Sequence, residues 1–139
     1  MNSENIKKIA YTDKELNNKG LRYKQLQEFD TEVNWSGLVE LIVRHYVESG
    51  IGMLKVPVET MIRVYFLQLR YNLNAREAAI ALSKIDVLRN FAIINIKTDV
   101  LPEEDSIDTF RSLVELTDLA NKFSAAFNIQ PMKQIVKEV

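Results

Sequence analysis

The stretch KVPVETMIRVYFLQLRYNLNAREAAIALSKI, from Lys55 to Ile85, reads as two helices separated by one tight corner. Pro57 suits the first turn of the first helix, because proline fixes the backbone there and loses no hydrogen bond. Apolar residues form one stripe along this helix and cover much of the rest, as in a helix buried at the centre of a domain. The stripe consists of Val58, Met61, Ile62, Tyr65, Leu69 and Leu73.

The corner and the second helix carry their own signals. Asn72 or Leu73 makes the corner, and Asn74 is a good N-cap for the helix that follows. Glu77 stands three residues after Asn74, where its side chain completes a capping box. The small residues of this helix allow a close approach to its neighbour, and they are Ala75, Ala78, Ala79 and Ala81.

Helical patterns continue on both sides of this pair. Upstream, we expect a short helix over residues 21–29 and an amphipathic helix behind Asn34, with Val33 and Leu38 at the hydrophobic-staple positions. Downstream, we expect a short turn from Asp86, a helix start marked by Asp105 with Asp108, and a last helix. The buried positions of that last helix are Leu119, Ala120, Phe123 and Phe127.

The run FAIINIKTDVL (91–101) is the only β-prone segment, and one strand cannot make a stable sheet. We therefore predict a buried connector or short turn there. The predicted fold is all-α: one domain of about five or six helices containing a helix-turn-helix-like pair. We expect a loosely ordered arm over 1–20, a helical domain over 21–130 and a short tail over 131–139.

Composition narrows the function classes. The chain has 139 residues, of which 47% are hydrophobic and 27% charged, as in an ordinary soluble domain. It has no cysteine, which excludes disulfides, thiolate nucleophiles and cysteine metal sites. No apolar run is long enough for a signal peptide or a membrane span, so we expect a cytoplasmic protein.

Charge is unevenly distributed although the formal net charge is only −1. Residues 61–100 carry a net +3, and residues 101–139 carry −3. Basic side chains on a helix face are usually solvated surface, but near a helix pair they also suit contact with phosphates. The residues that we predict to bind DNA are Arg63, Arg70, Arg76, Lys84 and Arg89.

Catalytic or metal chemistry finds little support in the sequence. One cluster of acidic residues consists of Glu103, Glu104, Asp105 and Asp108. We expect these carboxylates to stabilise a helix N-terminus through the helix dipole rather than to bind a metal ion, since metal ligands converge from several elements. His45 is the only histidine, and no nucleophile accompanies it in a recognisable pattern. We expect it to be a partly buried structural residue. We predict no enzyme activity, no catalytic residue, no metal site and no cofactor.

Four blocks, in order and spacing, resemble the N-terminal, non-catalytic domain of insertion-sequence-five-type DDE transposases. They are NWSGLVELIVRHY (34–46), VPVETMIRVYFLQLRYNLNAREAAIAL (56–82), LRNFA (88–92) and LPEEDSIDTFRSLVE (101–115), within a match over roughly Leu26 to Phe127. The resemblance implies a helical domain that recognises the terminal inverted repeats of an element during DNA recombination. Residues that match the family motifs as fold determinants are Pro57, Glu59, Met61, Arg63, Gln68, Tyr71, Leu73, Phe110 and Arg111.

The sequence departs from the family pattern at three places. It ends at Val139, before the first catalytic aspartate of the family is expected. Met53 and Leu54 stand where the family's glycine loop has arginines, and Pro102 precedes Glu103 instead of an aspartate. We therefore predict a DNA-binding module without catalysis that recognises or occupies element ends. The alternative is a protein-interaction module that binds no DNA and forms homo-oligomers or inhibits a full-length transposase.

Overall fold

The computed structural model describes residues 21–49 and 56–128, and seven helices lie within these ranges. They are α2 (Leu21–Glu32), α3 (Trp35–Ser49), α4 (Val58–Tyr71), α5 (Ala75–Lys84), α6 (Asp86–Phe91), α7 (Glu104–Glu115) and α8 (Leu119–Phe127). The described residues contain no strand. The all-α prediction is confirmed, with at least one helix more than expected. The predicted arm, the tail and the loop with Met53 and Leu54 lie outside the described residues, and the predicted division of the chain stays a prediction.

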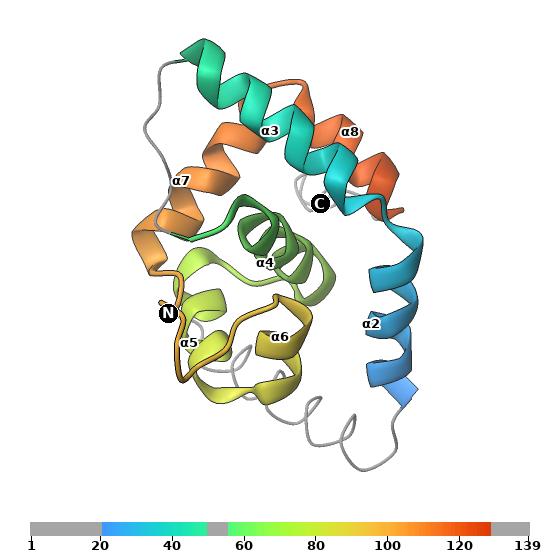
Figure 1. Ribbon diagram of the computed structural model, residues 1–139, viewed down its shortest axis with the longest axis vertical. Helices are drawn as coiled ribbons and strands as arrows, with labels where there is room; N and C mark the ends of the chain where they lie inside the picture. Colours follow the sequence, from blue (N-terminus) through green and yellow to red (C-terminus); the bar gives the residue numbers. More distant parts are fainter. Residues whose placement is uncertain (1–20, 50–55, 129–139) are drawn as a thin grey trace, which may run out of the picture.

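Helix α4 lies at the centre of the molecule. Figure 1 shows α3 and α8 on one side of it, α5 and α6 on the opposite side, and α2 and α7 at the flanks. Every residue from Thr60 to Leu69 is buried. The apolar pattern that surrounds this helix in the sequence therefore marks a central helix, as predicted.

Aromatic rings from five helices fill the space between α3, α4, α6 and α8. Phe66 of α4 lies with its ring centroid 5.1 Å from that of Phe127 and 5.3 Å from that of Phe91. Trp35 packs edge-on against Phe91 at 5.8 Å, and its indole N–H donates to the carbonyl of Asp30. Edge and tilted contacts of this kind stabilise aromatic clusters beyond the area that they bury. Trp35 and Phe110 are both buried, as their positions in the helical pattern imply.

Local signals place several helix ends correctly. Asn34 caps α3, since its Oδ1 accepts from the backbone N–H of Gly37 at 3.2 Å, and the staple residues Val33 and Leu38 are both buried. Two predicted starts are wrong by one residue. Pro57 is the N-cap of α4, with an extended ψ of 143°, rather than a first-turn residue. Helix α7 begins at Glu104, without a side-chain cap.

The segment between α6 and α7 (92–103) is a connector that holds its own shape. The backbone N–H of Asn95 donates to Asp99 Oδ2 at 2.8 Å, and the side chain of Asn95 accepts from the N–H of Lys97 at 3.0 Å. Local hydrogen bonds of this kind, rather than pairing with a strand, hold the β-prone segment in place. The expectation was a buried connector or short turn, and turns do occur at residues 92–93 and 96–98. The expectation of burial is only partly right, because Ile94 is buried while most of the other residues are exposed.

Candidate nucleic-acid interface

The corner between α4 and α5 is fixed by three separate hydrogen bonds. Asn72 adopts the left-handed conformation, with φ at 56°, and the N–H of Leu73 returns to the carbonyl of Gln68 at 2.9 Å. The Leu73 carbonyl accepts from Gln68 Nε2 at 3.2 Å and from Arg111 Nη1 of α7 at 3.3 Å. Asparagine tolerates this conformation better than most residues. The direction in which α5 leaves the corner is therefore set by α4 and α7 together.

The first turn of α5 forms the predicted capping box. The N–H of Glu77 donates to Asn74 Oδ1 at 2.8 Å, and the N–H of Asn74 donates to Glu77 Oε1 at 2.9 Å. Two backbone donors at the helix start are thereby satisfied by side chains. Because Glu77 is itself buried, the box also fastens α5 to the domain.

Helix α5 has one buried face and one outward face. Glu77, Ala78, Ala81 and Leu82 are buried, and the helix packs against α4, α6 and α7. The outward face, which we call the α5 face, consists of Arg76, Ile80, Ser83 and Lys84. Spacings of four and then three or four residues place these side chains on one side of a helix. Ile80 is half-buried, and the other three are exposed.

Arg63 does not belong to an exposed basic surface, contrary to the expectation from the sequence. It is only 4% exposed, and its guanidinium donates to Asp30 at 2.7 Å, to Glu59 at 3.0 Å and to the Phe91 carbonyl at 2.9 Å. The same group lies 4.3 Å above the centre of the Trp35 ring. Arg63 therefore joins α2, α4 and α6 inside the domain.

Arg89 is also directed inward, and its expected place on the DNA surface is corrected in the same way. It is 8% exposed, donates to the carbonyl of Leu82 at 2.7 Å and forms an ion pair with Asp86. Arg70 is exposed, with its guanidinium 5.8 Å from the ring centre of Phe29 on α2. Of the five predicted residues, only Arg76 and Lys84 share one exposed face.

A partly buried chain of polar side chains connects α4 and α7 to the corner. The hydroxyl of Tyr65 donates to Glu115 Oε2 at 3.1 Å, and Arg111 Nε donates to the same oxygen at 3.1 Å. Arg111 in turn reaches the Leu73 carbonyl. Burial raises the pKa of the Tyr65 phenol above its ordinary value, and the Glu115 carboxylate raises it further. The phenol is therefore held as a neutral hydrogen-bond donor.

The sequence of the chain decides its family. Residues 14–134 match the family model described as transposase domain (DUF772). The chain belongs to this transposase domain family. No solved structure matches the chain. The narrower resemblance, to the N-terminal domain of insertion-sequence-five-type enzymes, stays a prediction.

Several motif residues of the transposase domain meet at the corner. Gln68, Leu73 and Arg111, which the resemblance marks as fold determinants, form the hydrogen bonds described above. Glu59 and Arg63, two further residues of this set, form an i,i+4 ion pair. Gln68, Leu73 and Arg111 therefore hold the corner that precedes α5, whereas Arg63, paired with Glu59, connects α4 to α2 and α6.

The predicted acidic cluster lies around the start of α7. Glu103, Glu104, Asp105 and Asp108 are all exposed, and Glu104 and Asp105 occupy the first turn. Among the described residues, no three or more histidine, cysteine or acidic side chains are grouped to hold a metal ion. His45 is half-buried. No helix within the described ranges is long and apolar enough to cross a bilayer.

Proposed function

We propose that this transposase-family domain binds duplex DNA through the α5 face and recognises or occupies the terminal inverted repeats of an element. The observation that carries the proposal is that Arg76 and Lys84 lie exposed on one face of the helix that follows a rigid corner. Helix-turn-helix proteins place the second helix of such a pair in the major groove. Arg76 and Lys84 are the predicted residues that remain suited to this role.

The side chains of the α5 face are of the types that contact phosphates and bases in the major groove of DNA. Neither Arg76 nor Lys84 forms an ion pair with another described residue, so both cations are available for phosphates. Ile80 lies between them and offers an apolar contact of the kind that thymine methyl groups accept. Phosphate contacts fix position, and a central side chain such as Ile80 or Arg76 supplies preference among bases.

Few cations imply modest, salt-sensitive binding. Each neutralised phosphate contributes a slope of about −0.9 to the plot of log affinity against log salt concentration. Two contacts, from Arg76 and Lys84, correspond to a slope of about −1.8. If Arg70 also reached a phosphate, the slope would steepen to about −2.7.

A fluorescence-anisotropy titration of a labelled duplex, repeated across salt concentrations, tests the proposal. The double variant Arg76→Glu/Lys84→Glu is expected to abolish the binding that the native chain shows at low salt. The control Arg44→Glu/Lys122→Glu changes the net charge equally at exposed positions on α3 and α8, and it should bind nearly as the native chain does. No binding by the native chain, or equal losses in both double variants, would refute the α5 face. The alternative of an interaction module would then replace it.

The proposed role is binding without strand chemistry. The carboxylates of the acidic cluster come from one short segment, whereas a two-metal site clamps its ions between several elements. We expect no cleavage or joining of labelled inverted-repeat DNA when the purified chain is incubated with Mg²⁺ or Mn²⁺. Cleavage that Glu104→Ala abolishes would contradict this part of the proposal.

A further inference from the structure

Helix α6 ends in a turn that normally requires glycine. The N–H of Ile94 donates to the carbonyl of Arg89 at 3.0 Å, and the N–H of Ile93 donates to that of Asn90 at 3.2 Å. This pair of bonds defines a Schellman motif, whose residue after the C-cap is left-handed and is usually glycine. Ile93 occupies that position with φ at 60°. A β-branched residue is strongly disfavoured there.

The side chain of Ile93 gains no burial in return for this conformation. It is 55% exposed, while its neighbour Ile94 is buried. The other two described non-glycine residues with positive φ are Asn72 and Asn128, and asparagine is the side chain that tolerates the conformation best. Packing within this chain therefore does not explain an isoleucine at this position.

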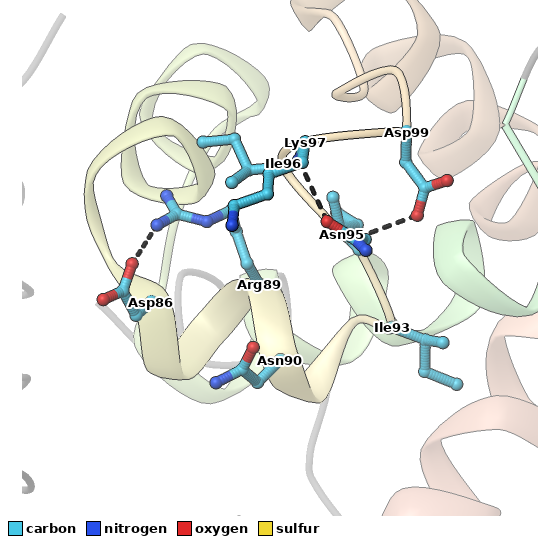
Figure 2. Close-up of a pocket in the computed structure, with 9 residues that line it drawn as sticks. Asp86, Arg89, Asn90, Ile93, Asn95, Ile96, Lys97 and Asp99 are labelled. Carbon is cyan, nitrogen blue, oxygen red and sulfur yellow. Dashed lines mark hydrogen bonds and ion pairs between the residues drawn. The ribbon is translucent and has the colours of Figure 1, made fainter.

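Ile93 belongs to an exposed apolar patch with hollows on both sides. We define the connector surface as Ile93, Ile96, Lys97, Asp99 and Val100 of the connector together with Asp86 of α6. Ile96 is 52% exposed and Val100 63% exposed. Ile93 borders a hollow of about 590 Å³ on the α6 side and one of about 250 Å³ beside Pro57 of α4. Figure 2 shows Asp86 and Arg89 along one side of the larger hollow, with Asn95 and Lys97 along the other.

The connector surface is held rigidly enough to act as a template. Thr60 Oγ1 donates to the Ala92 carbonyl at 2.8 Å, and Arg63 Nη1 donates to the Phe91 carbonyl at 2.9 Å. Both bonds tie the end of α6 to the central helix. The side chains of Asn95 and Asp99 hold the connector itself. Association therefore needs little ordering of this segment, which lowers its entropic cost.

The connector surface carries one basic and two acidic side chains, and the buried Arg89 that pairs with Asp86 brings the local charge to zero. Asp86 pairs with the buried Arg89, and Asp99 accepts a backbone N–H, while Lys97 has no acidic partner among the described residues. Asp86 remains 80% exposed at its side chain. A surface that presents an apolar ridge, adjoining hollows and both charge signs can be complementary to itself, as a twofold interface requires.

We propose that the connector surface is an isologous interface between two copies of this chain. In this dimer, Ile93 of each copy enters a hollow of the other, and Lys97 faces Asp86 of the second copy. The connector surface comprises six residues, fewer than the roughly 20–30 that each partner contributes to a standard interface, so we expect a weak dimer with a Kd between about 1 µM and 1 mM.

Sedimentation velocity of the full chain over a concentration series tests the proposed dimer. The mass of the native chain should rise from the 16.1 kDa of a monomer towards twice that value. Ile96→Asp and Lys97→Glu should each weaken association at least tenfold. Leu116→Asp is the matched control, because Leu116 is 84% exposed at the far end of α7, and it should dimerise as the native chain does.

Ile93→Gly separates association from folding, since glycine adopts the left-handed conformation freely. This variant should lose the dimer while its melting temperature, measured at a concentration where the native chain is monomeric, stays equal or rises. Four results would each overturn the proposal: a native chain that remains a monomer at millimolar concentration, connector variants that dimerise normally, a control that also dissociates, or a lower melting temperature for Ile93→Gly.

Discussion

Two helix ends in this molecule share one backbone geometry and differ in the residue that occupies it. Helix α4 ends with Asn72 and helix α6 with Ile93, both left-handed, and in each case the next residue is buried and returns a hydrogen bond across the turn. Both ends are braced from elsewhere in the fold: the first by Gln68 and Arg111, the second by Thr60 and Arg63.

The two helix ends differ in how well the residue suits the left-handed backbone: Asn72 suits it and Ile93 does not. Asparagine meets the backbone requirement of the first corner, and the corner then delivers α5 with its charged outward face. Isoleucine opposes the backbone requirement of the second and adds an exposed apolar side chain. The first turn therefore fixes the direction of α5, whereas the second leaves the side chain of Ile93 exposed at the surface.

The largest expected effect concerns Phe110, a fully buried residue of α7, the helix that packs against both α4 and α5. Phe110→Ala should lower the free energy of unfolding by about 3–5 kcal/mol, because a fully buried ring leaves a cavity. Ile96→Ala on the exposed connector should change it by less than about 0.5 kcal/mol. Urea unfolding of both variants measures the contrast, and similar midpoints would remove the distinction between a braced corner and a display surface.

The next prediction compares the stability that is lost when a buried arginine, Arg63, or an exposed one, Arg76, is replaced by alanine. Arg63→Ala should lower the free energy of unfolding by about 3 kcal/mol, since it removes a partly buried ion pair and a hydrogen bond to the end of α6. The loss lies at the lower end of the usual range because Asp30 is half-exposed. Arg76→Ala should cost less than about 0.5 kcal/mol. The same urea experiment applies. Equal losses would mean that Arg76 has a structural role and is not free for DNA.

Alkaline pH probes the polar chain under the first corner. The folded protein holds the Tyr65 proton to higher pH than the unfolded chain, which releases it near its ordinary pKa of about 10. The unfolded chain then binds fewer protons, so the free energy of unfolding should fall as pH rises above that value, by up to about 1.4 kcal/mol per pH unit. Tyr65→Phe should show a shallower decline. Parallel pH profiles for the two proteins would argue against this role.

The smallest expected effect compares the two left-handed residues directly. Ile93→Gly should raise the free energy of unfolding by up to about 1 kcal/mol, because relief of strain outweighs the added freedom of the unfolded chain. Asn72→Gly should give no gain, since asparagine already suits its site. Thermal unfolding of both variants under monomeric conditions measures the difference. A gain at Asn72 that equals the gain at Ile93 would show that the two ends are equivalent.

Local features of the fold were readable from the sequence because local rules govern them. The capping box of Asn74 and Glu77, the cap at Asn34 and the central character of α4 follow from spacing and residue type within one or two turns. The sequence pattern predicts the start of α7 at Asp105, one residue late, because Glu103 provides no side-chain cap.

The candidate site was harder to predict, because burial of a charge depends on distant partners. Arg63 and Asp30 are 33 residues apart, and no periodicity links α2 to α4. The sequence pattern predicts that Arg89 binds DNA, but its side chain is buried and donates to the Leu82 carbonyl. The left-handed backbone of Ile93 could not be predicted, because the turn imposes it and isoleucine in a β-prone run gives no signal for it.

The contact between Arg63 and Trp35 has an optical consequence. The chain contains one tryptophan, and its indole is bounded by a guanidinium, by the Phe91 ring and by the carbonyl of Asp30. Intrinsic emission of the protein therefore comes from the joint at which α2, α3, α4 and α6 meet. Separation of any of these helices would hydrate the indole and shift its emission to the red. Tryptophan fluorescence therefore reports the packing of these four helices within one chain.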